Sequence, residues 1–459
     1  MRDLKRRAIL VATLSSTLVG LAPATAVANG RYPASSAFIF AANEPDFVAL
    51  RATFGLLLSR DRGKTWDWVC EAGLGLTSSE DPMFTVTPDG TIIGSTFQGV
   101  GVSRDKLCSF PLVGGPMKDL VFIDLTTRPG ALGEVISLAS TYNGQDSNLN
   151  PLFKTVLFET KDEGKSFTPL GPPFNPALLG ETVDVAPSDG DRIYVTAKKN
   201  AVQPNATAHL FTSRDHASSW EENLVPLVGT ETSIFIAGVD AKNPDRIYLR
   251  TSGATDKPAR LLVSDDAGKT SRTIFTSTSA LMGFALSPDG ERVLTGTTTD
   301  GLQVASTKDF VFTQQSKVEI QCLAFSPEGL WACSNEKSGF VAGLSRDEGK
   351  TFEPKLHFCE IRGPVTGCPA ESTTQVECVL GGKAQKPPFG LLRNLFGCDI
   401  PEGGVPDAGA DAGASSPAAA DDEGCRVGAS PPGAGALALI GLASALAMSR
   451  RRLAPRGRR

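Results

Sequence analysis

Residues 59–66 read Ser-Arg-Asp-Arg-Gly-Lys-Thr-Trp, and this pattern returns along most of the chain. Ser or Thr comes first and Asp third, and the well-kept copies add Gly or Ala at the fifth position, Ser or Thr at the seventh and usually an aromatic residue at the eighth. Five copies are well kept, and two, around Asp105 and Asp309, are worn. The aspartates lie 38 to 57 residues apart: Asp61, Asp105, Asp162, Asp215, Asp266, Asp309 and Asp347. Repeats of roughly 20 to 50 residues are typical of propellers and solenoids, so the spacing predicts a repeated structural unit.

The motif reads as a tight turn between two strands. Its Asp side chain can accept hydrogen bonds from nearby backbone N–H groups, and the Gly two residues later tolerates a positive φ. After the first copy, Trp66, Trp68 and Cys70 alternate with Asp67 and Val69, the period of two that a strand requires. We therefore predict that the motif aspartates are structural.

A second turn signal precedes each Asp motif. Proline, followed within two residues by Asp, Glu or Gly, lies between apolar runs at Pro45, Pro88, Pro129, Pro187, Pro244, Pro288 and Pro327. Such combinations favour turns. Each unit then reads as strand A, Pro turn, strand B, loop, strand C, Asp turn and strand D. Seven such units predict an all-β fold, a seven-bladed β-propeller of four-stranded blades over residues 29–358.

The Asp motif resembles the Asp box, or BNR repeat, of sialidases, sortilin-type receptors and photosystem-assembly propellers. The stretches 29–33, 54–61 and 66–70 are similar to secreted myxobacterial BNR-repeat proteins, which are often catalogued as sialidase-like. The resemblance covers about residues 29–358 and implies a propeller scaffold. It implies no particular ligand, because the Asp boxes of this family are structural.

Both ends of the chain read as targeting segments. Residues 1–28 combine a basic start, an apolar run and a small-residue site, the pattern of a secretory signal peptide. Residues 401–424 are rich in Ala, Gly, Asp and Pro, and we expect a flexible linker there. Residues 425–459 hold Cys425, a 16-residue apolar run at 433–448 and a cluster of arginines.

This tail leaves two interpretations open. A plain single-pass membrane anchor is one, although the apolar run is shorter than the roughly 20 residues that span a bilayer. The arginines after it would stay cytoplasmic. The order of linker, lone Cys425, apolar helix and arginines also resembles MYXO-CTERM sorting tails, which implies that Cys425 is the point of processing and attachment. In both cases we expect an exported protein, secreted or held at the cell surface or outer membrane.

The charge of the exported part excludes one class of partner. Without residues 1–28 and 449–459 the chain carries 35 basic and 49 acidic side chains, a net charge of −14. Nucleic-acid binding depends on clustered Lys and Arg, so nucleic acid is not expected as a partner. We expect an extracellular protein or glycan partner, a monomeric ectodomain, and membrane contact only through the tail.

Eight of the nine cysteines precede the tail, and in an exported chain we expect disulfides among Cys70, Cys108, Cys322, Cys333, Cys359, Cys368, Cys378 and Cys398. Cys322 and Cys333 flank the last Pro turn and could face each other, and Cys70 could reach Cys108. The last four crowd residues 359–400, which lack the blade pattern and read as a disulfide-stapled cap. Zinc is the alternative, but no spacing matches a short Cys-x₂₋₄-Cys pair.

Loop lengths indicate where a ligand could bind. In a four-stranded blade the Pro and Asp turns share one end, and the B–C loops lie at the other. The third and fourth units carry long B–C insertions, 141–152 and 198–208. Ligand contacts on scaffold proteins concentrate on such loops, so the candidate contacts are Tyr142, Asp146, Lys198 and Lys199. The alternative is that these are tolerated surface insertions without a ligand.

An enzymatic interpretation follows from the resemblance to sialidases. That family pairs a tyrosine nucleophile and a glutamate with an aspartate acid/base and three arginines, and Arg31-Tyr-Pro33 is faintly similar to the Arg-Ile-Pro motif that carries one arginine. Tyr194 and Tyr248 occupy matching places in two repeats, which favours a packing role. We name no catalytic residue, and we treat a sialidase-type hydrolase as the alternative to a non-catalytic binding or scaffold module.

The chain has few residues that could form a catalytic triad or a metal site. The chain has three histidines, His209, His216 and His357, too few for most triads or zinc sites. One carboxylate per turn falls short of the six to eight oxygens that Ca²⁺ takes. We therefore expect neither a metal nor a cofactor.

Overall fold

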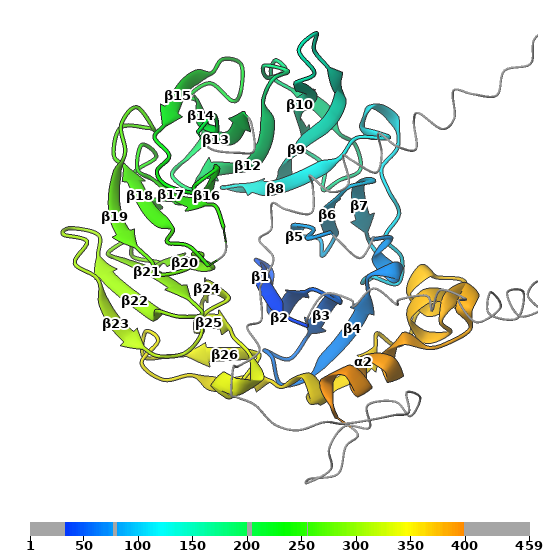
Figure 1. Ribbon diagram of the computed structural model, residues 1–459. Helices are drawn as coiled ribbons and strands as arrows, with labels where there is room; N and C mark the ends of the chain where they lie inside the picture. Colours follow the sequence, from blue (N-terminus) through cyan, green and yellow to red (C-terminus); the bar gives the residue numbers. More distant parts are fainter. Residues whose placement is uncertain (1–32, 77–79, 200–203, 255, 399–459) are drawn as a thin grey trace, which may run out of the picture. The chain divides into compact units, whose positions relative to one another are not determined.

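Seven sheets, antiparallel except for one added parallel strand, follow one another along residues 33–76, 80–199, 204–254 and 256–398, the parts that the computed structural model describes. In Figure 1 they stand around a common centre as a β-propeller, with the first strand of every sheet innermost. Each inner strand contacts the inner strand of the next blade, and the last contacts the first, so the ring is closed. The predicted all-β, seven-bladed fold is confirmed.

The first three blades use eleven strands of the described chain. They are β1 (Ser35–Ala41), β2 (Glu44–Ala52), β3 (Gly55–Ser59) and β4 (Trp66–Cys70); β5 (Phe84–Val86), β6 (Ile92–Thr96) and β7 (Gly99–Ser103); and β8 (Phe122–Arg128), β9 (Ala131–Gln145), β10 (Pro151–Thr160) and β11 (Thr168–Leu170).

Blades 4 to 7 each contain four consecutive strands. They are β12 (Leu179–Ala186), β13 (Asp189–Lys199), β14 (Thr207–Ser213) and β15 (Glu221–Val225); β16 (Ser233–Val239), β17 (Ile247–Ser252), β18 (Arg260–Ser264) and β19 (Arg272–Thr276); β20 (Gly283–Leu286), β21 (Arg292–Thr297), β22 (Gly301–Ser306) and β23 (Thr313–Ser316); and β24 (Cys322–Ser326), β25 (Gly329–Cys333), β26 (Ala342–Ser345) and β27 (Glu353–Leu356).

Two local features differ from the sequence pattern. Blade 2 lacks a regular fourth strand, and within the described residues only a single bridge, from Leu112 to Gly101, takes its place. The ring of Phe110 lies on this blade, 2.0 Å from where a Cβ of Gly101 would stand, so only a glycine fits there. In blade 1 the A–B turn is 42–43, and Pro45 lies inside β2 next to a register shift, where a missing N–H is tolerated.

The core lies between the blades. Large side chains from one sheet fill the space against the next, and Trp66, Tyr194, Tyr248 and Trp331 are almost fully buried there. Trp331 of blade 7 packs against Phe38 of blade 1, with ring centroids 5.3 Å apart. Burial of such rings adds apolar contact between the blades.

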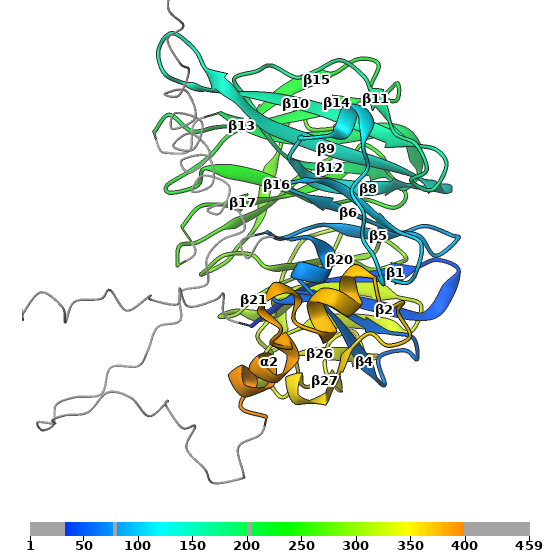
Figure 2. The same cartoon turned by 90° about the vertical axis from the view of Figure 1, so that its right-hand side faces the viewer.

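The segment after blade 7 returns to blade 1. It contains η4 (Phe358–Glu360), β28 (Ile361–Pro364), η5 (Gln375–Val379), η6 (Gly382–Ala384) and α2 (Pro388–Phe396), while η1 (Ala72–Leu74), η2 (Gly115–Met117) and η3 (Glu336–Ser338) lie within the ring. Strand β28 pairs in parallel with β4, and Figures 1 and 2 show α2 beside the same outer strand. Phe389 of α2 contacts Trp68, with ring centroids 5.8 Å apart.

Four disulfides hold the described chain, and they correct one predicted pairing. Cys322 and Cys333 face each other on β24 and β25 and are bonded, as expected. Cys70 is not bonded to Cys108, because the returning segment runs along the outer edge of blades 1 and 2 and brings cysteines to both. The other three bonds are Cys70–Cys378, Cys108–Cys368 and Cys359–Cys398. We call residues 358–398 the clasp.

Candidate functional site

The motif aspartates are saturated with hydrogen bonds from their own turns. Asp61 accepts the backbone N–H groups of Lys64 and Thr65 at 3.0 and 2.9 Å, and the hydroxyl of Thr65 at 2.6 Å. The N–H and hydroxyl bonds from the residue four positions on recur at Asp105, Asp162, Asp215, Asp266 and Asp347. At Asp347 the hydroxyl and N–H of Thr351 lower the pKa of the carboxyl to about 2. These carboxylates therefore act within the turns.

Asp309 departs from this pattern. Its carboxylate accepts a single hydrogen bond within the described residues, from the N–H of Val311 at 3.1 Å. Val311 stands where the well-kept motifs have Gly or Ala, and a β-branched residue resists the positive φ needed there. Phe310 keeps the positive φ, 54°, that the fourth position has in the other Asp turns, but Val311 does not have the positive φ of their fifth position. This turn is therefore built without the Asp network.

The described parts of the two insertions predicted for the third and fourth blades include extensions of their strands. Hairpin β9–β10 pairs Tyr142 with Phe153 and Gln145 with Pro151, and Figure 2 shows it projecting from the ring. In the next blade, β13 and β14 stay paired as far as Lys199 and Thr207. We call residues 141–152, 198–199 and 204–208 the hairpin rim.

Asp146 orders the tip of this hairpin. Its carboxylate accepts the N–H groups of Asn148 and Asn150 and the side-chain amide of Asn150, all at 2.8 to 2.9 Å. The side chain and N–H of Asn150 lower the pKa of Asp146, and the charge of Lys199 adds to this lowering. Leu149, between them, has a φ of 64° and is 74% exposed. The tip thus presents an apolar side chain in a conformation that leucine rarely adopts.

The four candidate contacts do not share one environment. Asp146 and Lys199 lie near each other at the rim, and Tyr142 is half-buried against Phe153, with ring centroids 6.3 Å apart. Lys198 is wrongly predicted as a surface contact: its side chain is 9% exposed and pairs with Glu181 at 2.7 Å. Alternation along β13 turns Lys198 inward and Lys199 outward.

Two carboxylates that the sequence did not single out lie on neighbouring inner strands. Asp124 of β8 accepts the N–H of Val183 in β12 at 2.8 Å, and Asp184 of β12 accepts the hydroxyl of Thr126 in β8 at 3.2 Å. Burial raises the pKa of Asp124 to about 7 and that of Asp184 to about 6. Since both bonds cross between blades, the pair fastens blade 3 to blade 4. The only sequence signal is an Asp between two apolar residues, Ile123 and Leu125 in β8 and Val183 and Val185 in β12.

Two arginines play a similar part on second strands. Arg51 of β2 donates to the carbonyl of Pro82 at 3.0 Å, and Arg250 of β17 donates to the carbonyl of Leu281 at 2.7 Å. Each bond reaches the segment just before the inner strand of the next blade. Arg250 also lies over the ring of Phe235, 5.2 Å from its centroid. Burial lowers the pKa of Arg250, and the nearby charge of Arg51 adds to the effect.

Two of the described tyrosines, Tyr194 and Tyr248, do not have the environment of a nucleophile. Tyr194 and Tyr248 are fully buried, and burial raises the pKa of each to about 12. An activated tyrosine would instead need a lowered pKa. The hydroxyl of Tyr194 donates to the carbonyl of Pro244 at 2.6 Å. Arg31, Tyr32 and Cys425 lie outside the described residues.

The histidines are paired with carboxylates. His209 contacts Glu222 at 2.7 Å, His216 contacts Glu159 at 2.6 Å, and His357 contacts Glu336 at 2.7 Å. In the described ranges no three His, Cys, Asp or Glu side chains cluster as metal ligands would. No helix in the same part of the chain is long and apolar enough to cross a membrane.

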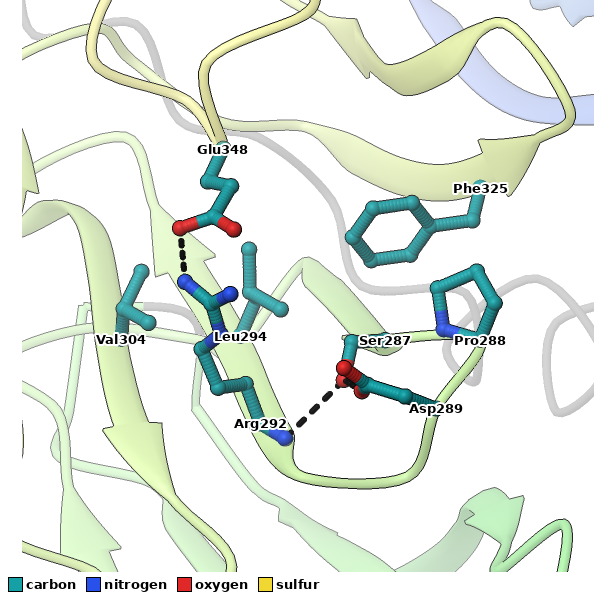
Figure 3. Close-up of a pocket in the computed structure, with 8 residues that line it drawn as sticks. All are labelled: Ser287, Pro288, Asp289, Arg292, Leu294, Val304, Phe325 and Glu348. Atoms are coloured by element: carbon teal, nitrogen blue, oxygen red, sulfur yellow. Dashed lines mark hydrogen bonds and ion pairs between the residues drawn. The ribbon is translucent and has the colours of Figure 1, made fainter.

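A cavity of about 230 Å³ lies between blades 6 and 7, on the side of the Asp turns (Figure 3). Its floor is apolar and its mouth is charged. The lining residues are Ser287, Pro288, Asp289, Arg292, Leu294, Val304, Phe325 and Glu348. Arg292 and Glu348 form an ion pair across the mouth. The hydroxyl of Ser287 donates to Asp289 and accepts the N–H of Arg292, so the polar wall is already hydrogen-bonded.

Comparison with known proteins identifies the fold and no family. No protein-family model matches the sequence, and no curated protein matches it either. Among solved structures, an ancestral GH74 enzyme is similar with a TM-score of 0.50 and 10% identity, over 70% of this chain and 46% of that one. The chain thus spans less than half of that enzyme's length. At this identity the likeness shows a propeller fold shared with an enzyme, and it does not decide whether this chain is catalytic.

Two further structures are similar at lower scores. The Cps50 (Swd1) β-propeller domain of Myceliophteria thermophila has a TM-score of 0.42 and 12% identity, over 66% of this chain and 95% of that one. YCF48 bound to D1 peptide has a TM-score of 0.32 and 16% identity, over 50% of this chain and 67% of that one.

Proposed function

We propose that this propeller is a non-catalytic binding or scaffold module of an exported protein, and that its partner contacts the hairpin rim. The observation that carries the proposal is the tip of β9–β10. Three hydrogen bonds to Asp146 hold the tip rigid, while Leu149 is 74% exposed and has a positive φ. Backbone strain that the surrounding structure maintains is typical of binding sites.

The composition of the rim supports a protein partner. Residues 141–150 contain one Tyr, one Gly, one Ser and three Asn, the residue types that enrich antibody paratopes because they combine aromatic area with adaptable hydrogen bonding. The same proposal includes export directed by residues 1–28, surface attachment through Cys425 and kinship with BNR-repeat proteins.

A hydrolase of sialidase type has less support. Such an enzyme needs an activated tyrosine beside a carboxylate, and the described tyrosines are buried or packed on phenylalanine. The measurement is release of a fluorogenic sialic-acid substrate by the full chain. Activity that is lost in Arg31→Ala would replace the binding proposal.

The binding proposal is tested by shortening the hairpin. Residues 143–152 are replaced by Asn-Gly, a two-residue turn that can join the paired Tyr142 and Phe153. Retention of the fluorescently labelled full chain on intact cells of the source organism should fall at least tenfold, with an unchanged melting temperature. Asp61→Ala is the matched control, which should lose stability and keep binding. Equal retention of the shortened and parent proteins would contradict the proposal.

A further inference from the structure

The cavity between blades 6 and 7 lies where other blades place a large ring. The second strands of blades 4 to 7 align through their pairing with the inner strands: Asp184 with Tyr194, Gly238 with Tyr248, Ala285 with Leu294, and Ala324 with Trp331. The preceding residues agree, since Arg192-Ile, Arg246-Ile and Arg292-Val lead into Tyr194, Tyr248 and Leu294. Blade 6 therefore carries leucine where its neighbours on both sides carry an aromatic residue.

The aromatic residues at this position fill the interface with the following blade. The hydroxyl of Tyr194 reaches the carbonyl of Pro244 in blade 5, and the ring of Tyr248 packs on Phe284 of blade 6 with centroids 5.4 Å apart. Trp331 likewise packs on blade 1. Leu294 is also buried and faces blade 7, but it is shorter than a phenol ring, and the cavity remains beside it.

The first three blades show that an aliphatic residue can be accommodated here. They carry Ala49, Ile93 and Ile136 at the equivalent position, opposite Leu58, Val102 and Glu159 of the third strands. Ile136 belongs to a buried cluster that includes Val185 and Ala217. The cavity at Leu294 is thus a property of this interface and not a necessary result of a smaller side chain.

We propose that this cavity is a binding site for a single aromatic ring. It is open to solvent at its mouth, and its volume of about 230 Å³ exceeds the roughly 150 Å³ of an enclosed apolar cavity that binds benzene. Leu294, Val304 and Phe325 supply apolar contacts, and Phe325 offers a ring face or edge to a second ring. This site is separate from the hairpin rim and does not depend on the function proposed there.

The mouth of the cavity limits how such a ring can enter. Pro288 and Asp289 are exposed, and the Arg292–Glu348 ion pair is about two-fifths exposed on each side. A ring would enter past these groups with its apolar edge toward Leu294 and its substituent toward the charges. The chemistry fits a para-substituted phenyl group, either as a free small molecule or as a tyrosine side chain of a peptide.

The test uses the purified full chain and two probes, p-cresol and the blocked peptide acetyl-Gly-Tyr-Gly-amide, observed by saturation-transfer NMR. Both should show saturation transfer, and the tighter of the two identifies the natural source as a free ring or a peptide side chain. Leu294→Tyr supplies the ring from the protein itself and should weaken binding at least tenfold. Val304→Phe fills the same space from β22 and serves if the first variant does not fold.

The matched control creates a second cavity at another interface between blades. Because the interface between blades 5 and 6 is packed around the ring of Tyr248, Tyr248→Leu should open a second space there and increase the saturation transfer to p-cresol. Binding of p-cresol that is unchanged in both filling variants would overturn the proposal. Competition by cyclohexylmethanol as strong as that by p-cresol would overturn it as well, because the site would then recognise apolar volume and not an aromatic ring.

Discussion

Cys70, at the end of the outer strand of blade 1, is bonded to Cys378, which lies 308 positions later in the chain. The bond joins the clasp to the blade with which the described ring begins. Four strands of blade 1 and the four strands of blade 7 are consecutive in sequence, and β28 of the clasp adds a fifth strand at the outer edge of blade 1. The inner contact of β24 with β1, the pairing of β28 with β4 and this disulfide together close the ring.

Removing this bond should destabilise the protein more than removing a local one. The variant Cys70→Ala/Cys378→Ala should lose about 3 to 5 kcal/mol of unfolding free energy. Cys322→Ala/Cys333→Ala, with a separation of 11 residues, is the control and should lose less, because a shorter loop constrains the unfolded chain less. Urea unfolding measures both, and an equal loss would mean that the clasp does not close the ring.

The Asp turns offer a matched pair of substitutions. Asp61→Ala removes an acceptor of several hydrogen bonds and should cost about 1 to 2 kcal/mol of unfolding free energy. Asp309→Ala removes an acceptor of one hydrogen bond and should lower the unfolding free energy by less than half as much. Thermal unfolding followed by circular dichroism measures the difference, and equal costs would show that the hydrogen-bond network of the turn contributes nothing.

The inner carboxylates predict a pH dependence of stability. Because their folded pKa values, about 7 for Asp124 and about 6 for Asp184, exceed that of an unfolded Asp, the folded state binds more protons between about pH 4 and 7. The stability that these two groups contribute should therefore be fully present at about pH 4 and below, and it should fall as the pH rises from about 4 to 7. Urea midpoints across this range measure the slope.

Asp184→Asn isolates one of the two groups. Its Oδ1 is the acceptor for both Val185 and Thr126, so an amide keeps these bonds while removing the titration. The fall in stability with pH should become shallower in this variant. Profiles with the same slope in both proteins would show that Asp184 does not carry a raised pKa.

Replacing Leu149 should have opposite effects on stability and on binding. Asn tolerates a left-handed backbone better than leucine, so Leu149→Asn should raise the unfolding free energy by roughly 0.5 kcal/mol. If the hairpin rim binds the partner, retention on cells should fall at the same time. The control is Leu224→Asn, at an exposed strand position without positive φ. This variant should show neither the gain in unfolding free energy nor the loss of binding. A Leu149→Asn protein that is less stable would refute the strain at the tip.

Repetition is what the sequence determined by itself. A turn depends on local hydrogen bonds and on the φ angles of its own residues. Asp61, Gly63 and their counterparts therefore predict each turn from a stretch of eight residues. Seven such turns with seven prolines leave little choice of fold. The pairing of Cys322 with Cys333 was also readable, because the two residues flank one short turn.

Contacts between blades were decided by the tertiary structure alone. The partners of Cys70 and Cys108 lie 308 and 260 positions away, and no local pattern records where the clasp returns. Lys198 and Lys199 are neighbours in sequence, yet the pleat of β13 buries the first against Glu181 and exposes the second. The cavity beside Leu294 results from the way blade 6 packs against blade 7. Local propensity determines each strand, but the size of the space between two blades depends on how side chains far apart in the sequence pack together.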